Sequence, residues 1–211
     1  MDYKDYSEKI LKGTTTVGIV CSDGILLGAD SRASADTFLA SSEAIKVNRI
    51  DEGLGMTIAG GVGDAQYIVK MLRAQNELFK MNEGRPLSPT AATSLLSLVL
   101  QENKMMPFFV QLLLGGMNNG TPELFSLDLM GGYIAESKFT STGSGSPVAL
   151  GYLEDVYRPG KSTQEMSKHA VKALKIAMKR DTATGDRIHV IAITKSGYKE
   201  YSKEEVDEMA K

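Results

Sequence analysis

The chain has 211 residues, enough for one domain with a sizeable buried core. Its 24 Lys and Arg nearly balance its 26 Asp and Glu, so the formal net charge of -2 gives no reason to expect nucleic acid or an anionic membrane as a partner. Cys21 is the only cysteine and there are only 2 histidines, which excludes an internal disulfide and argues against a metal centre. We therefore expect neither a metal nor a cofactor.

The sequence also lacks the usual signals of export or membrane insertion. No run of about 18 apolar residues occurs, so no transmembrane helix is expected. The first thirteen residues alternate charges and lack the apolar segment of a secretory signal. These features predict a cytoplasmic protein.

The first part of the chain predicts antiparallel strands. Residues 14–21 are rich in β-branched side chains, the turn signal Ser-Asp-Gly follows at 22–24, and an apolar run continues to residue 30. This pattern is typical of a β-hairpin. Two more strands are expected at 44–50 and 55–60, separated by Asp-Glu-Gly.

The rest of the chain alternates helix pairs with further strands. Apolar spacing predicts a helix over 64–81, and Ser88 followed by Pro89 marks the start of a second helix. Ser162 and Glu165 form the capping box of a later helix. The remaining expected elements are strands at 108–115, 122–130, 133–141, 187–194 and 198–201, and helices starting near 146 and 202.

This order of elements indicates a fold class. Strands, two helices, strands, two helices and strands do not follow the alternation of parallel βαβ units. The order instead predicts an α+β fold, a four-layer αββα sandwich of two antiparallel sheets flanked by helix pairs. We expect one such domain, with no internal repeat or linker.

Familiar hydrolase and nucleotide-binding motifs do not account for the chain. No glycine-rich loop ends in Gly-Lys-Ser/Thr, so a Walker-A phosphate site is absent. His189 alternates into an apolar strand and His169 lies in an amphipathic helical segment, so neither is placed as the base of a Ser-His-Asp triad. A hydrolase built on this sequence needs another base.

The junction of Gly13 and Thr14 offers one. Glycine ends a weakly patterned leader here, directly before the β-branched strand. If the 13–14 bond were cut, Thr14 would carry both a hydroxyl nucleophile and a free α-amine as its base. The alternative is that the threonine run simply begins a strand.

Several segments resemble the β subunits of archaeal proteasomes, in the same order and with similar spacing from about residue 8 to the C-terminus. They are Gly13-Thr-Thr-Thr-Val-Gly18, Asp30-Ser-Arg32, Lys46, Thr57-Ile-Ala-Gly60-Gly-Val-Gly-Asp-Ala65, Ser141-Thr-Gly-Ser-Gly-Ser146 and Arg180-Asp181-Thr-Ala-Thr-Gly185. The resemblance implies the αββα fold of N-terminal nucleophile hydrolases and the activity of a threonine endopeptidase. It implies a zymogen whose propeptide, residues 1–13, is removed by autocatalytic cleavage of Gly13–Thr14. The single catalytic domain would then be 14–211.

The resemblance places Lys46 and Asp30 beside the nucleophile. The expected strand alternation puts Lys46 and Asn48 on one face and Ile45 and Val47 on the other. An ammonium group near a free α-amine lowers the pKa of that amine, because it disfavours a second positive charge. Asp30 would keep Lys46 charged and oriented, and Arg32 would support the same region.

Four further positions complete the catalytic set that the resemblance implies. The backbone N–H of Gly60 would donate to the developing oxyanion. Ser144, Asp181 and Thr184 would form a hydrogen-bond network at the Thr14 amine. Thr184 stands where the family often has serine, so it keeps the hydroxyl but adds a methyl group.

The resemblance also implies how a peptide binds. An extended substrate would lie along backbone edges near Ser34, Gly60 and Val62 by strand addition. The primary specificity pocket maps to Ala33, Asn48, Ile58 and Val62, none of which is charged. We therefore expect cleavage after apolar or aromatic residues.

The family's architecture implies partners for the chain. It predicts homo-oligomeric seven-fold β rings, proteasome α-subunit rings, a regulatory ATPase cap and unfolded polypeptide substrates. Met105, Met106, Phe108 and Phe109 could supply interface surface or belong to the core. Two alternatives remain: a non-catalytic shell subunit of the same fold, and a bacterial two-ring peptidase driven by an ATPase.

Overall fold

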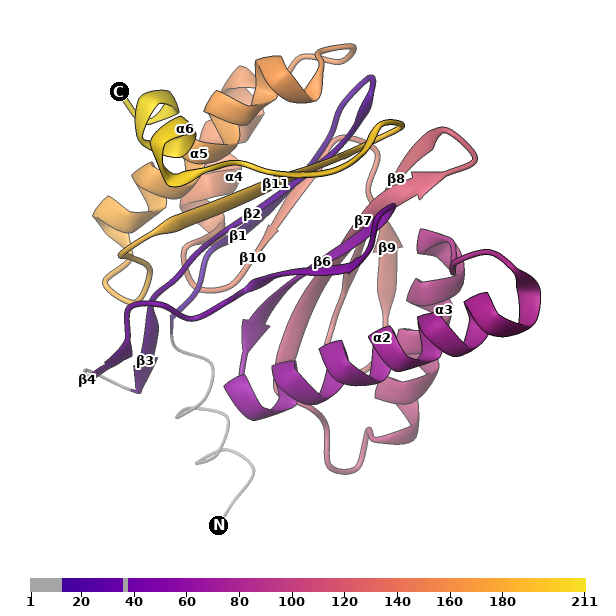
Figure 1. Ribbon diagram of the computed structural model, residues 1–211. Helices are drawn as coiled ribbons and strands as arrows, with labels where there is room; N and C mark the ends of the chain where they lie inside the picture. Colours follow the sequence, from indigo (N-terminus) through magenta and orange to yellow (C-terminus); the bar gives the residue numbers. More distant parts are fainter. Residues whose placement is uncertain (1–12, 36–37) are drawn as a thin grey trace.

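The computed structural model describes residues 13–35 and 38–211 and shows two antiparallel five-stranded sheets (Figure 1). The first sheet has the order β10-β1-β2-β11-β12. Its strands are β1 (Thr16–Val20), β2 (Gly24–Asp30), β10 (Phe139–Thr142), β11 (Ile188–Thr194) and β12 (Gly197–Glu200). The second has the order β5-β6-β7-β8-β9. Its strands are β5 (Val47–Asp51), β6 (Leu54–Gly60), β7 (Val110–Asn118), β8 (Thr121–Leu127) and β9 (Tyr133–Ala135).

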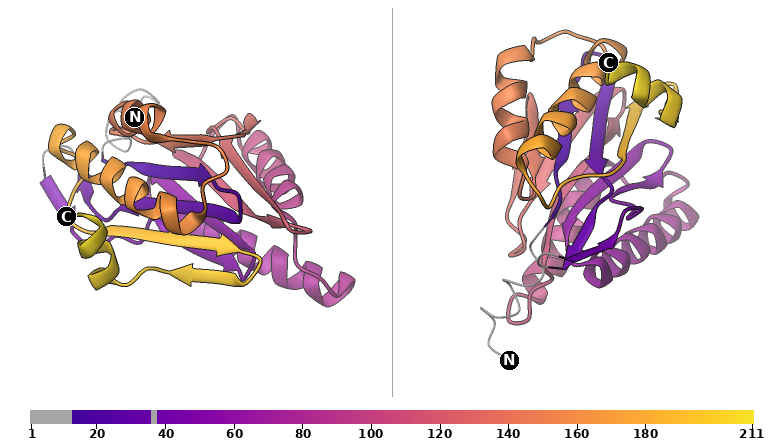
Figure 2. Two further views of the ribbon diagram at one scale, coloured as in Figure 1. Left: turned by 90° about the horizontal axis from the view of Figure 1, so that it is seen from above. Right: turned by 90° about the vertical axis from the view of Figure 1, so that its left-hand side faces the viewer.

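The helices cover the outer faces of these sheets. Those on the first sheet are α4 (Ser146–Val156), α5 (Thr163–Arg180) and α6 (Lys203–Met209). Those on the second sheet are α2 (Val62–Glu83) and α3 (Pro89–Glu102). Figure 2 shows the two helical layers on opposite sides of the molecule from two further directions. The expected four-layer αββα sandwich is confirmed.

Three apolar clusters hold the four layers together. One lies between the first sheet and α4, α5 and α6, and a second between the second sheet and the α2–α3 pair. The third joins the two sheets and consists of Ile25, Leu27, Leu113, Leu124, Ile191 and Ile193. Because β2 is covered on both faces, all seven of its residues are buried, which explains its continuous apolar pattern.

The local signals in the sequence placed most elements correctly. The β1–β2 hairpin pairs antiparallel, with Thr16 opposite Ala29. Ser88 caps α3, and the capping box of α5 joins Ser162 and Glu165 in both directions. Capping works here because these side chains satisfy N–H groups that the first helical turn leaves unpaired.

Two features differ from the expectation. The single strand expected over 133–141 is wrong, because the chain leaves β9 at the edge of the second sheet and enters β10 at the edge of the first. A small hairpin of β3 (Ala33–Ala35) and β4 (Phe38–Ser41) was not expected. Both of its strands are short and β4 is exposed, so burial left little periodic pattern to read.

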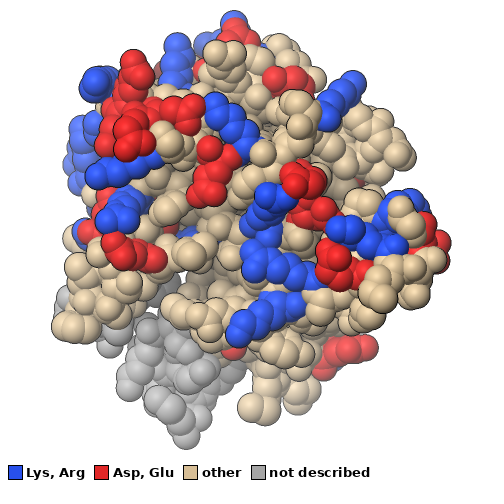
Figure 3. Space-filling view, in the orientation of Figure 1, with Lys and Arg blue, Asp and Glu red and all other residues tan. Residues whose placement is uncertain are grey.

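The surface carries charges of both signs. In Figure 3 basic and acidic side chains are interspersed over the visible face, while the described atoms low on the left edge, where β4 lies in Figure 1, are mostly uncharged. Phe38 and Leu39 of β4 contribute exposed apolar surface there. Within the described ranges, no helix combines the length and apolar character needed to cross a bilayer.

Candidate active site

Thr14 is buried directly before β1, with its hydroxyl against the preceding peptide bond. Its Oγ1 donates to the carbonyl oxygen of Gly13 at 2.5 Å. Gly13 has a φ of +114°, and a Cβ there would lie 2.3 Å from the Oγ of Ser34. Only glycine fits this backbone conformation and this space. The geometry therefore gives a physical reason for glycine at position 13, directly before Thr14.

Lys46 binds the same carbonyl oxygen. Its Nζ donates to Gly13 O at 3.0 Å and forms an ion pair with Asp30 Oδ1 at 2.9 Å. The exposed fractions are 8% for Lys46 and 0% for Asp30, whereas the neighbouring Ile45 is 76% exposed. Ile45 and Lys46 precede β5, and Val47 is partly buried against the cluster between the sheets, so the strand alternation expected from residue 45 is not observed. Burial lowers the pKa of Lys46 below its ordinary value, and the charge of Asp30 partly opposes that effect.

Asp30 lies at the end of β2 and accepts hydrogen bonds on both carboxylate oxygens. Its Oδ1 accepts from the Thr15 N–H at 2.9 Å in addition to Lys46. Its Oδ2 accepts from the N–H groups of Gly185 at 2.9 Å and Arg32 at 3.1 Å. Four donors around a fully buried carboxylate hold it in one orientation.

A second hydrogen-bond network reaches Thr14 from the segments at the start of α4 and at the end of α5. Ser144, in the loop between β10 and α4, accepts from the Thr14 N–H at 3.4 Å and donates to Asp181 Oδ2 at 2.5 Å. Thr184 Oγ1 donates to the same Asp181 oxygen at 2.5 Å and lies 2.8 Å from Thr15 Oγ1. The structure thus brings Ser144, Asp181 and Thr184 together, and Thr184 keeps its hydroxyl bonded despite the added methyl group.

Gly60 is the last residue of β6, the strand whose backbone also hydrogen-bonds to Lys46. The N–H of Ile58, two residues earlier, donates to the carbonyl of Lys46 at 3.0 Å. Gly60 has a φ of +137°, and a Cβ there would lie 1.9 Å from the carbonyl oxygen of Phe109. This place requires glycine for backbone reasons alone. Donation by its N–H to a substrate oxyanion stays a prediction.

The expected substrate-binding residues lie on elements that meet near this end of the sheets. Ala33 and Ser34 belong to β3, and Asn48 to β5. Val62 begins α2 and is 57% exposed, whereas Ile58 is 4% exposed and packs in the cluster beneath α2 and α3. Figure 1 shows β6 ending and α2 beginning on the side where β3 and β4 project. A pocket lined by these residues stays a prediction.

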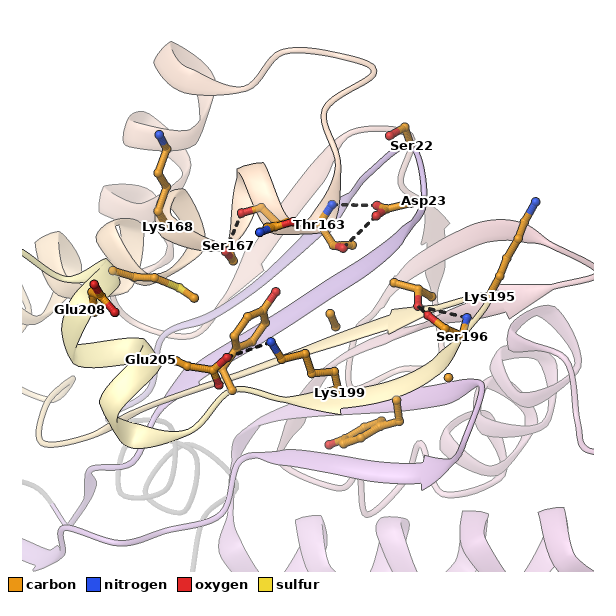
Figure 4. A pocket seen from close by; sticks show the side chains of 17 residues that line it. Ser22, Asp23, Thr163, Ser167, Lys168, Lys195, Ser196, Lys199, Glu205 and Glu208 are labelled. Carbon is orange, nitrogen blue, oxygen red and sulfur yellow. Dashed lines mark hydrogen bonds and ion pairs between the residues drawn. The ribbon is translucent and has the colours of Figure 1, made fainter.

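A cavity of about 1080 Å³ lies elsewhere, between α5, α6 and the β11–β12 hairpin (Figure 4). Its polar groups pair with one another: Asp23 accepts from Thr163, and Lys199 pairs with Glu205 at 2.8 Å. None of the expected catalytic or substrate-binding residues lines it. It is therefore separate from the Thr14 site.

Two residues of the site were missed from the sequence. Thr15 joins Asp30 to Thr184, and Asp186 binds the Arg32 side chain. The only sequence signal for these two residues was that each is polar and lies close to an expected catalytic residue, Thr15 next to Thr14 and Asp186 two residues after Thr184. Within residues 13–35 and 38–211, no cluster of three or more His, Cys, Asp or Glu side chains could hold a metal ion.

Comparisons with known proteins agree with this geometry. A family model described as "Proteasome subunit" matches residues 10–193. A protein of Methanothrix thermoacetophila named "Proteasome subunit beta" is 48% identical over 95% of this chain and 97% of its own length. Proteins of the same name from Methanohalophilus mahii and Methanocaldococcus vulcanius are also 48% identical, over 96% and 94% of this chain and 97% and 90% of their own lengths.

Proposed function

The chain belongs to the proteasome subunit family, and on this premise we propose that it is the catalytic β subunit of a proteasome core, a threonine endopeptidase activated by cleavage of Gly13–Thr14. The proposal is carried by one observation. The Gly13 carbonyl oxygen accepts both the Thr14 hydroxyl, at 2.5 Å, and the Lys46 ammonium, at 3.0 Å. A nucleophile and a cation therefore meet at the bond that must break. Residues 1–12 lie outside the described residues.

Self-cleavage follows from these contacts. Thr14 Oγ1 attacks the carbonyl carbon of Gly13, and negative charge develops on the oxygen that Lys46 contacts. A positioned cation stabilises such charge far better than water does. The C–N bond then breaks as the threonine nitrogen takes up the proton lost from Oγ1, which frees the α-amine and leaves an ester on Oγ1. Water hydrolyses the ester, releasing Gly13 as a carboxylate and restoring the Thr14 hydroxyl.

Substrate cleavage would reuse the same hydroxyl with the new amine as base. The amine takes the Oγ1 proton while Oγ1 attacks the scissile carbonyl, and it returns the proton to the leaving amine, which leaves the substrate acyl group as an ester on Oγ1. Water, losing a proton to the same amine, then hydrolyses this ester to release the second product and restore the hydroxyl. The reference pKa of an α-amine is about 7.8. The Lys46 ammonium lowers it, and so leaves more of the base free at neutral pH. The charge of Asp30 opposes the lowering of the Lys46 pKa by burial.

Ser144, Asp181 and Gly60 would serve this cycle around the amine and the oxyanion. The Ser144 hydroxyl already lies 3.4 Å from the Thr14 nitrogen and is anchored by Asp181. The N–H of Gly60 would donate to the oxyanion of a bound peptide. The uncharged Ala33 and the exposed Val62 favour cleavage after apolar residues of unfolded polypeptides.

Membership of the family implies assembly into multi-subunit rings. We propose seven-fold β rings stacked with α-subunit rings and served by an ATPase cap in the cytoplasm. Met105 and Met106 are exposed in the single chain, which supports an interface role, whereas Phe109 is buried and belongs to the core. Phe108 is half-buried and stacks on Tyr67 with ring centroids 5.4 Å apart.

Replacement of Thr14 tests the function directly. The wild-type protein, assembled with its α partner, should lose thirteen residues by intact-mass measurement and cleave fluorogenic peptides ending in Leu or Tyr faster than acidic ones. Thr14→Ala should keep the leader and cleave neither, and Thr14→Ser should mature and retain partial activity. Thr121→Ala, an exposed site on β8, is the matched control. A Thr14→Ala protein that matures and cleaves normally would refute the proposal.

A further inference from the structure

We propose that Arg32 and Asp186 are a positioning pair, whose contact holds the 182–186 loop against Asp30 and so keeps the Asp30–Lys46 ion pair in its reactive geometry. This inference rests on the proposed peptidase function. In the structure the two side chains contact this loop, while Asp30 and Lys46 hold the reacting groups. The pair would therefore act through Asp30.

The Arg32 side chain donates hydrogen bonds to both ends of the 182–186 loop. Its Nε donates to Asp186 Oδ2 at 3.0 Å and its Nη2 to Asp186 Oδ1 at 3.3 Å, which is the two-pronged geometry that fixes orientation. Its Nη1 donates to the carbonyl of Thr182 at 2.8 Å. All three guanidinium nitrogens are therefore used on this one loop.

The loop residue between these anchors binds Asp30. The N–H of Gly185 donates to Asp30 Oδ2 at 2.9 Å, and a Cβ at Gly185 would lie 2.3 Å from the guanidinium carbon of Arg32. The Gly185 peptide is thus held between the guanidinium and the carboxylate. Because the Arg32 backbone N–H donates to the same oxygen, one arginine fixes Asp30 both directly and through the loop.

Asp186 also adopts an uncommon backbone conformation. Its φ is +70°, in the left-handed region that residues other than glycine, asparagine and aspartate seldom occupy. The two bonds to Arg32 stabilise this conformation. If these bonds are lost, the loop can change conformation, and the Gly185 N–H then moves away from Asp30 Oδ2. The same loop carries Thr184, which binds Asp181 and Thr15.

The charges around Lys46 determine the expected effect on pH dependence. Asp30, Asp181 and Asp186 all raise the pKa of Lys46 against the lowering effect of burial, and Arg32 lies on the far side of Asp30. Removing the Asp186 carboxylate leaves Arg32 unneutralised. The pKa of Lys46 then falls further, so activity that needs its ammonium declines at a lower pH.

The test compares Asp186→Ala with Asp186→Asn in the assembled, leader-free particle. Both variants remove the charge, but asparagine keeps an acceptor for Arg32 and tolerates the left-handed backbone. The control is Arg187→Ala, which breaks only an exposed ion pair with Glu43 at 2.7 Å. kcat/KM for a fluorogenic peptide is measured over a range of pH, after intact mass and thermal unfolding show a processed, folded particle.

We expect Asp186→Ala to lower kcat/KM by about 10- to 100-fold, the scale of a small misplacement of reacting groups. Asp186→Asn should lose less, and both should show the high-pH decline at lower pH. Arg187→Ala should match the wild type. Unchanged kcat/KM and an unchanged high-pH decline in a folded Asp186→Ala particle would overturn the inference. If that variant does not assemble, an unchanged decline in Asp186→Asn overturns it. A wild-type particle without Thr14-dependent cleavage would refute the proposed function instead.

Discussion

Replacing Asp30 by asparagine removes the counter-charge of the buried lysine while keeping the size of the side chain. Lys46 Nζ and Asp30 Oδ1 are 2.9 Å apart, which corresponds to about 6 kcal/mol of attraction at an effective dielectric of about 20. Desolvation offsets part of this, and removal of one partner of a buried pair costs about 3–5 kcal/mol in stability. Burial already lowers the pKa of Lys46, and Asp30→Asn should lower it further because the opposing charge is removed.

The consequence for activity follows from a smaller population of the Lys46 ammonium and from the loss of the carboxylate that orients it. Without a charged and oriented Lys46, the charge on the Gly13 carbonyl oxygen is less stabilised and the pKa of the Thr14 amine is lowered less. Loss of one such group typically costs about 10²- to 10³-fold in rate. We therefore expect Asp30→Asn to slow leader removal by at least about 100-fold.

Intact-mass measurements during assembly give the rate of leader removal, and denaturant unfolding gives the stability. Glu43→Gln, an exposed carboxylate paired with Arg187, is the matched control and should behave as the wild type. Wild-type processing and wild-type stability in Asp30→Asn would show that the buried ion pair is not needed, and the reasoning would be wrong.

Two further predictions concern stability. Leu113→Ala, in the cluster between the sheets, should lower the free energy of unfolding by about 2–5 kcal/mol in denaturant titrations. The control Leu98→Ala, on the exposed face of α3, should change it by less than about 0.5 kcal/mol. Equal losses in the two variants would contradict the assigned core. Hydrogen bonds from Lys161 and from Ser162 lower the pKa of Glu165 to about 2. Because this pKa is depressed by folding, its stabilising effect is present above about pH 4.5 and is lost as the pH falls toward about 2. The stability difference between the wild type and Glu165→Gln should therefore shrink over this range, and a constant difference would show that the cap does not act through the charge of Glu165.

The elements that the sequence predicts correctly are those governed by local rules. The Ser-Asp-Gly turn at 22–24, the cap at Ser88 and the capping box at Ser162 depend on residues within a few positions of one another. The glycine at residue 13 is also explained locally, because its φ of +114° is a backbone conformation that favours glycine. The role of Thr14 as nucleophile stays a prediction, and the burial of Lys46 is visible only in the folded chain.

Partners distant in the sequence could not be found in this way. The alternating pattern of 133–141 indicates strand conformation, but it does not say that β9 and β10 join different sheets, since neither partner strand is encoded locally. The contact of Asp30 with Lys46 was expected only through the resemblance to a family, and the contact of Arg32 with Asp186 was not expected at all.

The sequence alone thus determined the layered fold class and indicated Thr14 as the predicted nucleophile. The tertiary structure decided which charges meet around that residue. The packing of the two sheets brings the end of β2, the residue before β5 and the loop after α5 together at one buried point. At that point the distances between groups, rather than their spacing along the chain, determine pKa values and reactivity.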